Sequence, residues 1–187
     1  YKRQLLVCLT ACRKGEIQKL KWDNIDFSRT DTTPYGLITI KNADTKTKRD
    51  LTHGDYYIPL TKQLANLLKR YEELTKDINS PYLFCSCRDV NKPIVSSALL
   101  LPKNISCFMD LHGLRKTAST FLNAHSTEYS FDIDDIERVL HHKTDTNRVR
   151  AIYNKYDYLK EHYQLLAFYN DYIEREQLTQ PFLELVK

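Results

Sequence analysis

Four short segments of this chain hold the side chains whose types and spacing could do chemistry. Arginine binds anionic oxygens through a planar fork that keeps its proton, and lysine and histidine can donate or accept protons. Tyrosine offers a hydroxyl group that becomes a nucleophile once it is activated. Such a set suits a reaction at a phosphate, where arginines hold the charge and a hydroxyl attacks. In chain order the residues are Arg13 with Glu16, Lys46, His112 with Arg115, His142 and Tyr153.

Each of these residues also has an ordinary interpretation when it is taken alone. Arg13 could pair with Glu16 on one helical turn, and Lys46 could be a solvated charge in a polar turn. Tyr153 could be a core residue, because the chain contains 13 tyrosines. The ordered set is much more specific than any of its members.

In this order the residues resemble the catalytic set of the tyrosine recombinases of the phage-integrase family. The surrounding motifs agree with that resemblance, and the match covers almost the whole chain. The motifs are Arg13-Lys-Gly-Glu16, Lys46 followed by Ile58-Pro-Leu60, His112-Gly-Leu-Arg115, and Ala151-Ile-Tyr-Asn-Lys-Tyr-Asp-Tyr-Leu159. The last of them is similar to the ending of integrases from prophages and genomic islands.

The resemblance implies a role for each residue. Arg13 and Arg115 would bind the phosphate, and Tyr153 would be the nucleophile that forms a covalent 3′-phosphotyrosine. Lys46 would be the general acid, on a hairpin. His112 and His142 would transfer protons or donate hydrogen bonds, and Glu16 would support Arg13. The resemblance implies neither a metal nor a cofactor. Basic residues expected on the DNA are Lys14, Lys48, Arg49, Lys116 and Lys143.

Three features depart from the family pattern. The family has a small residue before its second histidine, whereas this chain has His141, so His141 and His142 compete for that role. We favour His142, because Leu-x-His-Lys then aligns best. Lys48 similarly competes with Lys46, since the segment that follows Lys46 is long. The interval from His142 to Tyr153 is also slightly longer than expected.

The hydrophobic pattern predicts a mainly α chain with a small antiparallel β-sheet, an α+β fold. By resemblance this is the catalytic-domain fold of the tyrosine recombinases. Strands are expected at 35–41 and 56–59, joined by a long basic hairpin, with strand-like sequence also near 22–27. Helices are expected at 2–12, 16–21, 61–78, 93–108, 111–124, 132–140, 147–152 and 157–173.

Composition indicates an ordinary globular domain with a weak preference for polyanions. The chain has 187 residues, 42% of them hydrophobic, and a formal net charge of +4. No apolar run is long enough for a membrane span. Five cysteines without a paired framework suggest reduced thiols and a cytoplasmic protein. Cys85 and Cys87 lack a matching pair of ligands, so no metal centre is expected.

The resemblance also sets expectations for domains and partners. Residues 1–187 would be an N-terminally truncated catalytic domain without the core-binding domain that grips DNA, and 174–187 a tail exchanged between subunits. The partners would be double-stranded attachment sites, three further copies in a homotetramer and possible accessory DNA-bending proteins. The alternatives are relaxation of DNA, as by a type IB topoisomerase, and a catalytically inactive DNA-binding module of the same fold.

Overall fold

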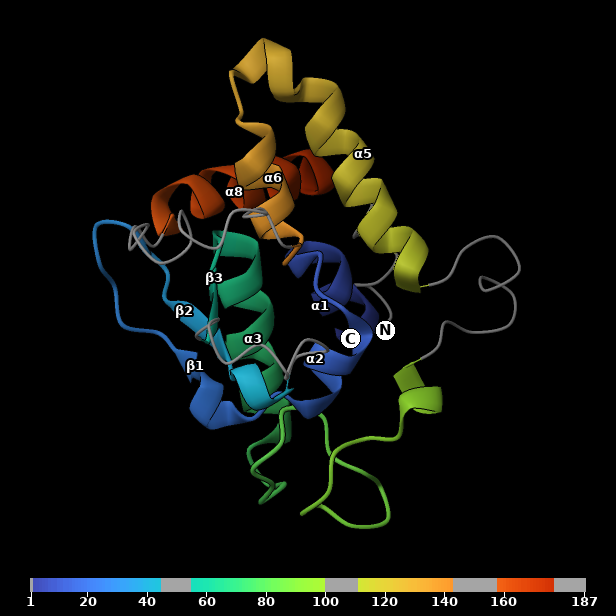
Figure 1. The fold of residues 1–187 in the computed structure, drawn as a ribbon. Helices are drawn as coiled ribbons and strands as arrows, with labels where there is room; N and C mark the ends of the chain where they lie inside the picture. The colour runs from blue at the N-terminus through green and yellow to red at the C-terminus, as the bar shows by residue number, and fades with distance from the viewer. Residues whose placement is uncertain (1, 45–54, 100–110, 143–157, 177–187) are drawn as a thin grey trace.

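The computed structural model describes residues 2–44, 55–99, 111–142 and 158–176, and this part is mainly helical with one small sheet (Figure 1). The expected α+β class is therefore confirmed. The α-helices are α1 Lys2–Thr10, α2 Lys14–Lys19, α3 Lys62–Thr75, α5 Leu111–Tyr129, α6 Ile133–Val139 and α8 Leu159–Arg175. The strands are β1 Ile25–Asp26, β2 Leu37–Ile40 and β3 Tyr56–Pro59; short 3-10 helices are η1 Trp22–Asn24, η2 Asn42–Asp44 and η3 Ser96–Leu99.

Helix α1 lies in the middle of the molecule and packs against α3, α5 and α8 (Figure 1). Four consecutive residues, Gln4 to Val7, are buried, so this helix is enclosed on several sides and does not show one apolar stripe. Three consecutive apolar residues, Leu5, Leu6 and Val7, point to different sides of the helix, so the helix is buried on several sides. Because α1 ends at Thr10, the chain leaves the core immediately before Arg13.

The three strands form an antiparallel sheet in the order β1-β2-β3. Ile38 pairs with Ile58, and Ile40 pairs with Tyr56. Successive side chains of a strand alternate between faces, so these four side chains lie on one face, and the three isoleucines are fully buried. Since β3 also packs against α8, the same alternation directs Tyr56 toward the helices at the end of the sheet.

A buried hydrogen bond ties α8 to the start of α3. Thr61 caps α3, because its hydroxyl oxygen accepts a hydrogen bond from the backbone N–H of Leu64 at 3.3 Å. The same hydroxyl accepts a second bond, 2.8 Å long, from the side-chain amide of Asn170, which is fully buried. This link fixes α8, the helix that follows the expected nucleophile in sequence.

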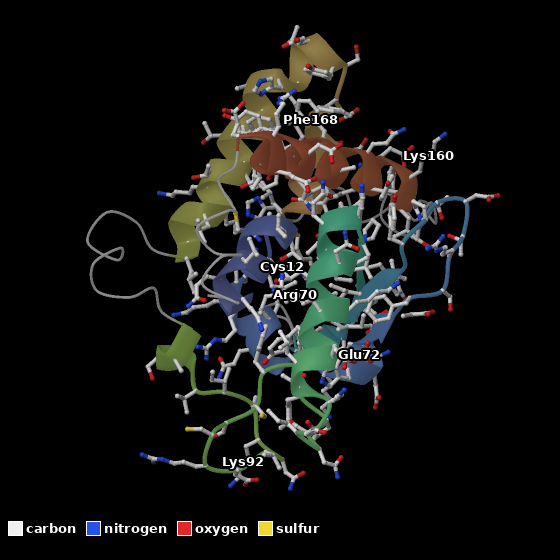
Figure 2. All side chains as sticks on the ribbon, turned by 180° about the vertical axis from the view of Figure 1, so that it is seen from behind. Cys12, Arg70, Glu72, Lys92, Lys160 and Phe168 are labelled. Carbon is white, nitrogen blue, oxygen red and sulfur yellow. The ribbon has the colours of Figure 1, made fainter. Side chains whose placement is uncertain are left out.

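Two expected helices differ most from the observed ones, and the helix expected at 147–152 lies outside the described residues. Helix α5 runs to Tyr129 rather than residue 124, because His125 and Tyr129 contact the rings of Phe121 and Phe168 and so extend the packed face (Figure 2 shows Phe168 on α8). The helix expected at 93–108 is wrong at its beginning, where the backbone N–H of Ile94 donates to the carbonyl of Phe84 at 2.9 Å. That segment pairs like a strand before the short 3-10 helix η3.

No helix in the described part of the chain is both long and apolar enough to cross a membrane.

Gly36 fixes the turn that leads into β2, and replacing it should be costly. Its φ of +111° is a conformation that L residues rarely adopt, and an added Cβ would lie 2.2 Å from the carbonyl oxygen of Asp26. We expect Gly36→Ala to destabilise the fold by about 1–3 kcal/mol or more, measured by urea unfolding. Gly15→Ala is the matched control, because a Cβ added there would have no atom within 4 Å beyond the neighbouring backbone. Equal stability of the two variants would contradict this account.

Candidate active site

Arg13 and Glu16 are placed by the sharp turn between α1 and α2. Ala11 has a left-handed φ of 53°, which reverses the chain, and Arg13 then precedes the first turn of α2 in an extended conformation. Glu16 lies buried in that turn, where its Oε2 accepts a hydrogen bond from the backbone N–H of Arg13 at 3.0 Å. An acidic side chain at this position satisfies a free N–H of the helix and favours its positive end.

Arg115 joins the end of α1 to the end of α6. It lies on α5 one turn after His112, and only 5% of its surface is exposed. Nη1 donates to the carbonyl of Ala11 at 2.8 Å, and Nη2 donates to the carbonyl of Leu140. Burial, and then the like charge of Arg13, lower the pKa of Arg115 from its usual value, but an arginine keeps its proton at neutral pH.

The two arginines converge on one turn of the backbone. Both terminal nitrogens of Arg13 donate to the carbonyl of His141, at 3.2 and 3.3 Å, next to the Leu140 carbonyl that binds Arg115. These carbonyls lie at the C-terminal end of α6, where a helix carries partial negative charge. Residues that lie 128 and 25 positions apart along the chain are thereby brought together.

The charge of this group is positive. Among the described residues, Glu16 is the one carboxylate paired with the two arginines, and its Oε1 lies 3.4 Å from Nη1 of Arg13. Burial raises the pKa of Glu16, but hydrogen bonds from His141 and from the backbone of Arg13 outweigh it and lower the pKa below its usual value. One carboxylate against two guanidinium groups leaves a centre that attracts an anion.

The three histidines of the motifs lie in different surroundings. His112 is exposed in the first turn of α5. His142 is also exposed, and its Nδ1 lies 2.6 Å from Oε2 of Glu137 on α6. His141 is partly buried, and its Nδ1 lies 3.1 Å from Oε1 of Glu16. The structure thus brings His141 into contact with Glu16 and the Arg13 side chain, whereas the His142 ring is turned toward α6.

Tyr56 is a site residue that sequence reasoning placed only in a strand. Its ring stacks on His141, with 4.0 Å between ring centroids and 2° between planes. Its hydroxyl donates to the carbonyl of Val139 at 2.8 Å and approaches that of Arg138 at 3.2 Å. Burial raises the pKa of the Tyr56 hydroxyl, so it remains a donor. No signal in the sequence of β3 could have found it, because the contact joins segments that lie far apart in the chain.

Several expected site residues lie outside the described part of the chain. They are Lys46, Lys48, Arg49, Lys143 and Tyr153, together with 177–187 of the expected tail. The described ends of the segment that holds Lys46 are joined by Lys41 and Asp55, whose charged atoms lie 2.8 Å apart. Of the expected DNA-binding residues, Lys14 and Lys116 are described, and both are exposed beside an arginine of the site.

Among the described residues, no group of three or more His, Cys, Asp or Glu side chains is placed to hold a metal ion.

Comparison with known proteins identifies the class of protein to which this fold and site belong. A family model described as the phage integrase family matches residues 4–160, so the chain belongs to that family. The described fold is also similar to a crystal structure of XerA recombinase, with a TM-score of 0.52 at 20% identity. That likeness covers 96% of this chain and 56% of the other, and it concerns the fold.

Individual relatives include integrases of phages and prophages. The chain is 31% identical over 169 residues to prophage integrase IntA of Escherichia coli (strain K12), covering 89% of this chain and 37% of the relative. It is 28% identical over 170 residues to the integrase of Shigella phage Sf6, covering 89% and 40% respectively. The chain therefore spans about two fifths of the length of the curated relatives it matches.

Proposed function

We propose that this chain is the catalytic part of a tyrosine site-specific recombinase that integrates or excises mobile DNA. The observation that carries the proposal is the convergence of Arg13 and Arg115 on successive carbonyls at the end of α6. That arrangement holds two forks of N–H donors in one place and leaves a positive centre for an anion. The names of the relatives, which include integrases of phages and prophages, support DNA as the source of that anion.

The proposed reaction is a transesterification at a phosphodiester. The Tyr153 hydroxyl passes its proton to His112 or His142, its oxygen forms a bond to phosphorus, and the bond from phosphorus to the 5′-oxygen breaks. The 5′-oxygen leaves with a proton from Lys46, and a 3′-phosphotyrosine remains. Attack by a 5′-hydroxyl on the phosphotyrosine reverses these changes, so rejoining the DNA strand requires no nucleoside triphosphate. Arg13 and Arg115 stabilise the charge that develops on the pentavalent phosphorus.

The remaining roles follow the same assignment. His112 and His142 hydrogen-bond the phosphate oxygens or move protons, and Glu16 supports Arg13. The basic side chains beside the motifs bind DNA phosphates, which provides affinity but little sequence information. We further propose that the whole recombinase is cytoplasmic and acts as a homotetramer on two attachment sites, with residues 174–187 as the tail exchanged between subunits. In this proposal, residues 1–187 correspond to the catalytic domain of the longer relatives.

A covalent trapping experiment tests the proposed function. The full-length recombinase is incubated with a nicked duplex of its attachment site, from which the cleaved fragment diffuses away. A denaturing gel should then show a protein–DNA adduct. Absence of any adduct, with binding retained, would indicate the inactive DNA-binding module instead. Relaxation of a supercoiled plasmid that lacks an attachment site would indicate the topoisomerase alternative.

Lys46 should become dispensable when the leaving group needs no proton. A bridging 5′-sulfur leaves as a thiolate, whose conjugate acid is much stronger than an alcohol. Lys46→Ala should therefore slow cleavage of normal DNA by roughly 10²- to 10⁴-fold and be largely rescued on the sulfur substrate. Lys48→Ala is the matched control and should cleave both substrates at nearly the wild-type rate. Equal defects of Lys46→Ala on both substrates would remove it from the acid role.

A further inference from the structure

His141 lies in a left-handed turn at the C-terminal end of α6. Its φ is 50°, the left-handed region, which costs a residue with a Cβ roughly 1–2 kcal/mol. The position comes immediately after Leu140, the C-terminal cap of α6. A large ring at this position therefore needs contacts that offset the strain.

Two contacts hold the His141 ring. On one side Nδ1 lies 3.1 Å from Oε1 of Glu16, and because Glu16 is ionised, Nδ1–H is the donor. On one face the ring lies flat on Tyr56, which is itself fixed by its hydrogen bond to Val139. Tyr56 in turn contacts the ring of His162 on α8, at 5.7 Å between centroids. The imidazole is thus fixed both by a hydrogen bond and by a stack of rings.

His141 acts on Arg13 through two routes. Its carbonyl accepts both terminal N–H groups of Arg13. Its ring holds Oε1 of Glu16 at 3.1 Å, closer than the 3.4 Å that separates the same oxygen from Nη1 of Arg13. Glu16 is also held by the Arg13 backbone through its other oxygen. Both oxygens of the Glu16 carboxylate therefore accept hydrogen bonds from other groups. The carboxylate is held in place beside the Arg13 guanidinium and restricts its position, while its own contact with the guanidinium is the longer one.

We propose that His141 is a positioning residue, which orients the Arg13 guanidinium for the substrate phosphate by holding Glu16. This inference rests on the proposed function and gives His141 a role distinct from that of His142, whose ring is turned to Glu137. His141 touches neither the phosphate nor the nucleophile in this role. It acts through Glu16 and Arg13, so its effect depends on both.

The kinetic test uses single-turnover cleavage by the full-length recombinase on the nicked duplex. His141→Gly relieves the strained φ but removes the ring, and it should slow cleavage roughly 10- to 100-fold with DNA affinity unchanged. His141→Asn should recover most of that rate, since asparagine tolerates a left-handed φ and its amide replaces Nδ1–H as a donor. In an Arg13→Ala background, His141→Gly should change the rate less than about twofold. The proposal would be overturned if His141→Gly slowed cleavage by a further 10- to 100-fold in the Arg13→Ala background. It would also be overturned if His141→Gly alone cleaved at the wild-type rate.

A second measurement separates this inference from the proposed function. The Glu16 carboxyl is titrated by carbon-13 NMR in wild type, in His141→Gly and in the matched control His142→Gly. Loss of the hydrogen bond from His141 should raise the pKa of Glu16, and the control should leave that pKa unchanged. An unchanged pKa in His141→Gly would overturn the positioning role alone. Absence of an adduct from the wild-type enzyme would overturn the proposed function, whatever the titration shows.

Discussion

Tyr153→Phe is expected to bind DNA like the wild-type enzyme and to form no covalent adduct. The substitution removes one oxygen, so it deletes the proposed nucleophile and changes the shape of the side chain very little. Loss of a nucleophile lowers a rate by roughly 10⁴-fold or more, because the remaining groups can stabilise charge but cannot form the bond. Adduct yield on the nicked duplex is read from a denaturing gel, and affinity is read from a gel shift.

The neighbouring tyrosines provide the matched controls for this prediction. Tyr156→Phe and Tyr158→Phe each remove the same atom close to Tyr153 in the sequence. Tyr158 precedes α8, and the Arg138 guanidinium lies 3.7 Å from the centre of its ring, a contact that phenylalanine preserves. Both controls should form the adduct. If one of them loses it while Tyr153→Phe retains it, the motif has been aligned in the wrong register.

Arg115→Ala is expected to lose stability as well as cleavage. The side chain is buried and bridges two carbonyls, those of Ala11 and Leu140. An unsatisfied buried polar group costs about 1–3 kcal/mol, and two groups lose their donor here. We expect the unfolding free energy to fall by roughly 3 kcal/mol, and the cleavage rate to fall by at least about 10²- to 10³-fold. Arg115→Lys should also be defective, because one ammonium group cannot reproduce the fork.

Arg13→Ala is the comparison that separates the two losses. About a third of the Arg13 side chain is exposed, and its partners are the carbonyl of His141 and Glu16. Its removal should slow cleavage as strongly as Arg115→Ala while lowering stability by less than about 1 kcal/mol. Urea unfolding measures stability, and single-turnover cleavage measures the rate. If Arg13→Ala were the less stable variant, the structural role assigned to Arg115 would be wrong.

Sequence reasoning predicted the parts of the fold that depend on local pattern. The strand at Tyr56–Pro59 has the expected bounds, and the helix expected at 132–140 is observed as α6, with Asp132 as its N-terminal cap. The end of α5 was missed, because the polar residues near 125 give no apolar period. That extension depends on aromatic contacts with α8, which lie far away in the sequence.

The candidate site shows the same division between local and long-range information. The order of residue types led to Arg13, Glu16 and Arg115, and the structure brings them together. The sequence could not show which histidine faces Glu16, because His141 and His142 are adjacent and their orientation depends on one left-handed φ. Tyr56 was missed for a similar reason, since nothing in the sequence of β3 shows that its ring meets a turn beyond α6.

Apart from Glu16, the described acceptors that hold the two arginines are backbone carbonyls, and this affects how the site can change by mutation. Those of Ala11, Leu140 and His141 are present whatever side chain occupies each position. A substitution that changes only the side chain therefore cannot remove these carbonyl groups. Only a substitution that redirects the backbone can do so, such as proline at either left-handed position, Ala11 or His141. A library of random substitutions should accordingly tolerate many apolar residues at Leu140, while proline at 11 or 141 abolishes function.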